Sequence, residues 1–262
     1  MQRNLCARRE YFLYGQTARP RLYLYRPHGR STQEKNRMIL PGKFFKSSVG
    51  RKSLMAVTGL VLITFVIAHL SGNFLVYGGR DALNNYAVLL RTFPKVLWTA
   101  RIVLLCLAVI HIGTGLSLVL ENRRARPVKY AKESTIQASI ASRTMALTGL
   151  VILFYVIYHI LHITLGVVHS NLYSHMDGQG RPDPYTTLIQ SFQNPVIGGV
   201  YIASMFFLAL HLSHAVPSLF QTLGWNSPRF DRFFKTVGAV FAVILFFGYS
   251  SIPVSIWLGL VR

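Results

Sequence analysis

Charged residues are scarce in this chain, and acidic residues are the scarcest of all. Of its 262 residues 14% are charged and 52% are apolar, and only eight are Asp or Glu. A soluble domain carries about 25% charged residues, so the composition argues against an ordinary soluble protein and points to a membrane. The two cysteines, Cys6 and Cys106, lie far apart, which excludes a disulfide framework or a cysteine-rich metal motif.

Long apolar runs occupy most of the chain. A helix needs about 20 mostly apolar residues to cross a bilayer. Five stretches without Asp, Glu or Lys meet this requirement: 55–77, 96–120, 145–168, 196–220 and 236–260. Arg101 lies near the start of the second stretch, where its side chain can reach the membrane surface. The sequence therefore predicts an all-α integral membrane protein, a bundle of five transmembrane helices.

The formal net charge of +20 would suit a nucleic-acid-binding protein, but its distribution argues otherwise. Basic residues concentrate in positions 1–52, 123–143 and 229–235, whereas the connections 78–95 and 169–194 hold few. Lys and Arg accumulate in cytoplasmic segments of membrane proteins. We therefore predict a multi-pass protein of the cell inner (plasma) membrane, with the N-terminus in the cytoplasm and the C-terminus outside.

The N-terminal tail, residues 1–42, differs from the membrane domain, residues 43–262. The tail is basic and aromatic, with little helical periodicity. It faintly resembles a transit peptide, and it can also be interpreted as a tail attracted to the membrane surface or as the product of a translation start upstream of Met38. We expect residues 1–37 to be dispensable.

Histidines are the most unusual feature of the apolar stretches. A polar group without a partner in lipid costs several kcal/mol, so each is a functional candidate, although a single histidine can also hydrogen-bond a neighbouring helix. Neutral imidazole is a common metal ligand, and four histidines on four helices can form two bis-histidine haem sites. Apart from the single Cys106, the stretches lack the cysteines and carboxylates of zinc sites. Six histidines lie in them: His69, His111, His159, His162, His211 and His214.

A sequence repeat and the expected depth in the membrane divide four of these histidines into two pairs. The segments TGLVLITFVIAHL (58–70) and TGLVILFYVIYHI (148–160) each place a histidine ten residues after a glycine. Counting from the connections puts His69 and His159 nearer the outside than His111 and His211, by roughly 9–12 Å at 1.5 Å per residue. We predict that His69 and His159, the outer pair, hold one haem, and that His111 and His211, the inner pair, hold the other.

His162 and His214 compete with these ligands, because each follows a stronger candidate by three residues. The repeat argues against His162, whose counterpart in the first span is Gly72. Small residues follow His111 and His211, among them Gly113 and Ser213, and leave room for a macrocycle. This pattern favours His211 over His214.

Three segments in combination resemble a known family. They are SSVGRKSLMAVTGLVLITFVIAHLSGN, RTMALTGLVILFYVIYHILH and LALHLSHAVPSLFQTLGWN. They are similar to the first, third and fourth helices of the cytochrome b subunit of type B succinate:quinone oxidoreductases, the succinate dehydrogenases and related fumarate reductases. The resemblance extends from about Phe45 to the C-terminus.

The resemblance implies a membrane anchor with two haem b groups, His69 and His159 on one iron and His111 and His211 on the other. It also implies a flavoprotein subunit and an iron–sulfur subunit on the cytoplasmic face, and electron transfer from succinate to a quinone, with menaquinone favoured. The chain would be the electron-transfer subunit of complex II and hold no succinate site. Ala209 replaces a glutamate of some fumarate-reducing members, which favours succinate oxidation.

Other assignments stay open. The quinone or the haem propionates have positional candidates, each with a solvated or interfacial alternative: Arg51, Lys52, Asn73, Arg143 and His162. Quinone type, haem potentials, working direction and the oligomeric state of the complex are undetermined. Two rival interpretations are the dihaem anchor of another respiratory dehydrogenase and a non-haem membrane scaffold with packing histidines.

Overall fold

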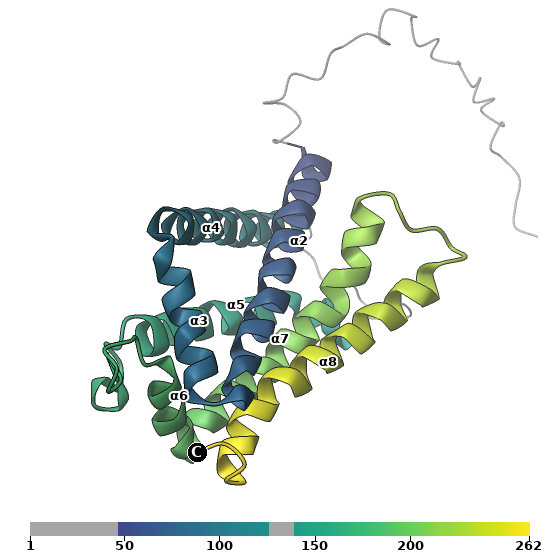
Figure 1. Ribbon diagram of the computed structural model, residues 1–262. Coiled ribbons are helices and arrows are strands. Elements are labelled where there is room, and N and C mark those ends of the chain that lie inside the picture. The colour runs from purple at the N-terminus through teal and green to yellow at the C-terminus, as the bar shows by residue number, and fades with distance from the viewer. Residues whose placement is uncertain (1–46, 126–138) are drawn as a thin grey trace, which may run out of the picture. The chain divides into compact units, whose positions relative to one another are not determined.

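The computed structural model describes residues 47–125 and 139–262, which are helical and contain no strand (Figure 1). The tail 1–42 and the connection 126–138 lie outside this range. The long helices are α2 (Ser48–Asn73), α4 (Pro94–Arg124), α5 (Ile140–His159), α7 (Pro195–Thr222) and α8 (Asp231–Trp257). The shorter elements are η2 (Phe74–Gly78), α3 (Arg80–Thr92), η3 (Ile160–Thr164), η4 (Ser170–Leu172) and α6 (Pro184–Gln193).

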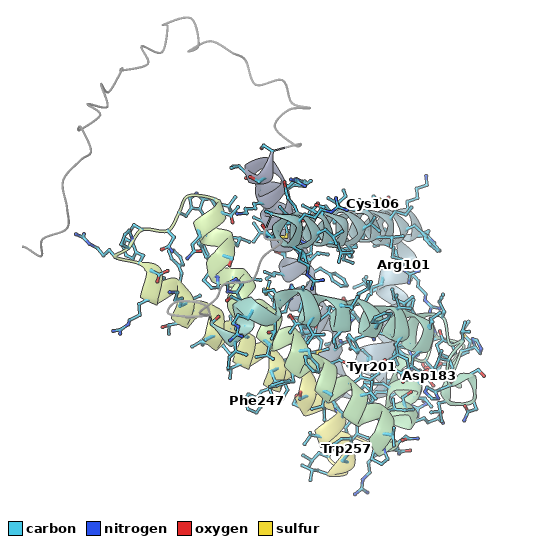
Figure 2. The ribbon with its side chains drawn as sticks, turned by 180° about the vertical axis from the view of Figure 1, so that it is seen from behind. Arg101, Cys106, Asp183, Tyr201, Phe247 and Trp257 are labelled. Atoms are coloured by element: carbon cyan, nitrogen blue, oxygen red, sulfur yellow. The ribbon has the colours of Figure 1, made fainter. Side chains whose placement is uncertain are left out.

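As predicted, the described residues contain five helices that are long and apolar enough to cross a membrane. They are the five long helices, with η2 continuing α2 and η3 continuing α5. Large apolar side chains such as Phe154, Val196 and Phe247 are exposed, and in Figure 2 Phe247 points away from the ribbons. Apolar surface on this scale suits contact with lipid.

Local sequence sets the ends of these helices. Ser47 Oγ accepts a hydrogen bond from the Gly50 N–H at 3.0 Å, so α2 begins at Ser48, seven residues before the predicted start of the first span. A side-chain cap of this kind satisfies an N–H that has no partner in the first turn. At the third span, Gly166 adopts a φ of 63°, and the helix ends at Thr164 instead of the predicted residue 168.

Helix α7 is the central packing element. It packs most extensively against α8 and also contacts α5 and α2, while α2 packs against α4. Figure 1 shows α7 and α8 side by side. One core cluster joins Leu70 of α2, Leu212 of α7, and Ala242 and Leu245 of α8. Three of the four helices that carry the candidate ligands therefore pack together: α2 and α5 both contact α7.

A folded cap covers one end of the long helices. It consists of α3, α6 and residues 165–183, and we call it the α3–α6 cap. The sequence predicts these stretches only as connections between spans, but the structure places a helix in each. The cap shares a core cluster with the ends of η2, α7 and α8: Val76, Leu83, Tyr185, Ile189, Phe192, Ile197, Tyr201, Ile252, Ile256 and Val261.

A polar network latches the two cap helices together. Asn84 of α3 is fully buried, and its Nδ2 donates to Asp177 Oδ2 at 3.1 Å and Asp183 Oδ1 at 3.0 Å. Arg181 pairs with Asp177 at 2.8 Å and with Asp81 of α3 at 2.6 Å. Figure 2 labels Asp183, whose carboxylate also accepts from the Thr186 N–H and so caps α6. Each buried carboxylate is therefore paired, as burial of charge requires.

Candidate functional site

The outer pair meets in the structure. His69, near the end of α2, and His159, the last residue of α5, have ring centroids 5.9 Å apart and ring planes at 80°. A metal–imidazole bond is about 2.0–2.1 Å long, so two imidazoles on either side of one metal atom have centroids about 6 Å apart. Phe65 stacks on His69 at 5.4 Å. The two rings of the outer pair are therefore close enough to hold one metal atom between them.

A buried hydrogen-bond chain continues from the outer pair. His159 Nδ1 lies 3.4 Å from the hydroxyl of Tyr201 on α7, which lies 3.0 Å from His162 Nδ1. His162 Nε2 in turn lies 3.0 Å from Ser191 Oγ of α6. Figure 2 labels Tyr201, which is placed towards the same end of the helices as Asp183. Both nitrogens of His162 are thus occupied, which leaves none for a metal.

The backbone explains why His162 departs from the face of His159. Directly after His159 the helix widens into the π-turn η3, marked by the hydrogen bond from the Leu165 N–H to the Ile160 carbonyl. A π-turn holds more residues per turn than an α-helix, so each residue advances by a smaller angle and His162 stops farther short of the face of His159, on the side towards α6. In a regular α-helix two residues three apart lie near one face, so the separation of His159 and His162 could not be predicted from a sequence in which a π-turn leaves no clear signal.

The first inner histidine is held by α2. His111 Nδ1 of α4 lies 3.1 Å from Thr58 Oγ1 and 3.2 Å from the Met55 carbonyl oxygen. The Thr58 hydroxyl lies 2.8 Å from the Leu54 carbonyl and donates its one hydrogen to its own helix. Both partners of Nδ1 are therefore acceptors, so Nδ1 carries the hydrogen and Nε2 keeps a free lone pair.

The second inner histidine repeats this arrangement on α5 and α7. His211 Nδ1 lies 3.2 Å from Thr148 Oγ1. The Thr148 hydroxyl lies 3.1 Å from the carbonyls of Thr144 and Met145 in its own helix. His211 is therefore also an Nδ1–H tautomer with Nε2 available. His111 and His211 are close enough for an electrostatic interaction, which places the inner pair in one region of the structure.

The glycines of the repeat make room for these two rings. A Cβ added at Gly59 would lie 3.1 Å from His111 Cε1, and one added at Gly149 would lie 3.4 Å from His211 Cε1. The Thr-Gly element thus contacts the inner pair, a role that the repeat does not reveal in the sequence, where its histidine is the more conspicuous residue. Thr58 and Thr148 each precede an outer ligand by eleven residues. The two levels are therefore about 16 Å apart along the helices, more than the count from the connections predicts.

The remaining candidates differ in their surroundings. His214 Nε2 lies 3.1 Å from Ser218 Oγ one turn away. Arg51 forms an ion pair with Glu121, and its Nε is buried without a hydrogen-bond partner. Asn73 is half-buried. Lys52 and Arg143 are exposed at the end of the helices away from the cap. Of these basic residues Arg51 alone combines burial with an unused donor, which suits a carboxylate partner.

Two further findings bound the site. Over residues 47–125 and 139–262, no group of three or more His, Cys, Asp or Glu side chains is arranged to hold a metal ion, whereas the candidate histidines form two pairs. Comparison with models of known protein families, with curated proteins and with solved structures found no match. The interpretation of the site therefore depends on its own geometry and chemistry.

Proposed function

We propose that this chain is a dihaem cytochrome b, in which His69 and His159 would hold one haem iron and His111 and His211 would hold the other. The main support for this proposal is that both inner histidines are hydrogen-bonded through Nδ1 and keep Nε2 available. Histidines that bind a metal through one ring nitrogen usually donate a hydrogen bond from the other, and both inner histidines do so. The 5.9 Å spacing of the outer pair supports the second site.

The protein residues have distinct tasks in this proposal. A bound haem supplies one-electron transfer. The histidines hold it, and Thr58, Thr148 and Tyr201 hold the histidines through Nδ1. The apolar helices keep water from the ligands. Arg51, with its buried and unpaired Nε, is the best candidate in the described residues for contact with a haem propionate.

The wider assignment is the membrane anchor of a succinate:quinone oxidoreductase. It rests on the family resemblance and on the four-histidine arrangement. The basic end of the helices, with Arg51 and Lys52 on α2 and Arg123 and Arg124 on α4, would face the cytoplasm. There it would bind the iron–sulfur subunit, which in turn carries the flavoprotein subunit. Electrons from succinate would reach the inner haem first, then the outer haem and membrane quinone, with menaquinone favoured.

Purification of the intact complex from native membranes tests this function. We expect two haems b per chain and co-purification with a flavoprotein and an iron–sulfur protein, with haem reduction on addition of succinate. A haem-containing complex with a different dehydrogenase would support an anchor of another respiratory enzyme. A colourless preparation would support the scaffold interpretation and contradict the proposal.

A further inference from the structure

We propose that the pairs Thr58-Gly59 and Thr148-Gly149 are positioning elements for the inner ligands: each threonine fixes the tautomer and rotation of a histidine on the next helix, and each glycine admits the edge of its ring. This inference rests on the proposed function, since it assigns to these residues the orientation of two haem ligands. It explains why the repeat begins with Thr-Gly although its histidine lies ten residues later.

The threonines are unusual among the hydroxyl residues of their own helices. Thr64 on α2 bonds the Leu60 carbonyl and Thr144 on α5 bonds the Ile140 carbonyl, the ordinary arrangement for threonine inside a helix. Thr58 and Thr148 make the same bond to their own helix but also reach a histidine of another helix. They are 2% and 1% exposed, so water cannot replace the hydroxyl if it is removed.

Burial and tautomer together give the hydroxyl a chemical effect. Its hydrogen is committed to the helix carbonyl, so its lone pair accepts the Nδ1–H of the histidine. An acceptor at Nδ1 raises the basicity of the ligating nitrogen, which stabilises ferric over ferrous iron and lowers the reduction potential. Each Nδ1 also has a carbonyl acceptor, Met55 for His111 and Met145 for His211, so removing the hydroxyl takes away one of two acceptors. The reduction potential of the inner haem should therefore rise, and the ring should be free to rotate towards the carbonyl.

The test is a redox titration and an EPR spectrum of the whole purified complex carrying Thr58→Val or Thr148→Val. Valine keeps the shape of threonine without its hydroxyl. We expect the inner haem, identified as the one lost from His111 and His211 variants, to shift to higher potential and to change its EPR g-values, which report the rotation of the imidazole planes. Thr58→Ser and Thr148→Ser should restore both properties. Thr64→Val and Thr144→Val are the matched controls and should change neither.

Gly59→Ala provides a second test if a valine variant does not assemble. The substitution keeps the hydroxyl and presses a methyl group against His111 Cε1, so it should change the g-values of the inner haem. Gly199→Ala, whose added Cβ meets nothing within 4 Å, should leave the spectrum unchanged.

The possible outcomes distinguish a failure of this inference from a failure of the proposed dihaem function. Valine or Gly59→Ala variants with two haems and unaltered inner-haem signals would overturn the positioning role and leave the dihaem assignment standing. A shift confined to the outer haem would also overturn it. If the complex without any substitution contains no haem, both proposals are wrong.

Discussion

At the scale of single residues, an imidazole in a membrane helix has two nitrogens to satisfy, and the protein divides its histidines by how it does so. His162 uses both nitrogens in hydrogen bonds to Tyr201 and Ser191. His111 and His211 use Nδ1 and keep Nε2 free. An unpaired polar atom is costly in lipid, so a free Nε2 on each of two helices is best explained by a ligand.

Replacing either histidine of a proposed pair should therefore remove the same haem. We expect His69→Gln and His159→Gln to remove the same haem, and His111→Gln and His211→Gln to remove the other. The inner variants should impair haem reduction by succinate more, because in the proposed complex electrons would meet that haem first. Redox titration of each variant, with the two haems resolved by potential, checks the pairing.

His162→Gln and His214→Gln are the matched controls for these substitutions, since each alters a histidine three residues from a proposed ligand. Both should retain two haems. Some ligand variants will assemble poorly, because loss of a haem leaves a cavity in the bundle. Loss of the same haem from His69 and His111 variants would show that the pairing is wrong.

Tyr201 gives a second prediction at this scale. Tyr201→Phe removes the hydroxyl that lies between His159 Nδ1 and His162 Nδ1. Leaving buried polar atoms without a partner costs about 1–3 kcal/mol, so the midpoint of thermal unfolding should fall. The potential of the outer haem should shift while that of the inner haem stays constant. Tyr77→Phe, which removes the exposed hydrogen bond to Ser251, is the control, and an equal effect there would contradict a specific role for Tyr201.

At the scale of elements, the α3–α6 cap is held by carboxylates whose pKa values the fold has lowered. Burial alone would raise the pKa of Asp183, but hydrogen bonds from Thr186 and Asn84 and the charge of Arg80 outweigh it. The pKa of Asp177 is likewise lowered, because hydrogen bonds from Arg181, Asn84 and Gln179 outweigh the effect of its burial. Both groups thus favour the folded cap when ionised.

The cap should consequently open in acid. A carboxylate with a lowered folded pKa contributes its full stabilisation above its ordinary value of 3.8 and loses it as the pH falls through the folded value. Hydrogen exchange corrected for intrinsic rates should show α3 and α6 losing protection below about pH 4, before α7 and α8 do. Asp183→Asn should weaken this pH dependence. Protection of α3 and α6 that does not vary between pH 6 and pH 3 would contradict the latch.

The contrast between spans and cap shows what the sequence can reveal about elements. Membrane spans follow from length and apolar composition, two properties that are local in the sequence. The cap helices are short and amphipathic, and α3 buries both Leu83 and Asn84. A search for long apolar runs passes over such helices, because their apolar residues lie on one face only. The contact between His111 and Thr58 depends on which faces of α2 and α4 meet. Such a contact between helices is not encoded in a single stretch of residues.

At the scale of the whole molecule, the two ends of the helices differ in their charge. In the described residues the cap carries three arginines, Arg80, Arg91 and Arg181, and three aspartates, Asp81, Asp177 and Asp183. The opposite end carries an excess of exposed basic side chains, including Lys52, Arg123, Arg124 and Arg143. A balanced, folded end suits the outer surface, and an end with unpaired positive charge suits the cytoplasm and an acidic protein partner.

This asymmetry leads to a prediction about orientation. Gly180 lies at an exposed turn of the cap with a φ of 72° and open space around it, and such a tip tolerates an insertion. Reporter fusions at Gly180 and after Arg262 should both report the outside. A fusion at Ser227, in the connection between α7 and α8, is the matched control and should report the cytoplasm. The pairing of histidines would survive a reversed result at all three positions, since it depends on contacts within the bundle. The naming of inner and outer haems would not, and the proposed dehydrogenase would then have to bind at the α3–α6 cap, where most of the charges are already paired.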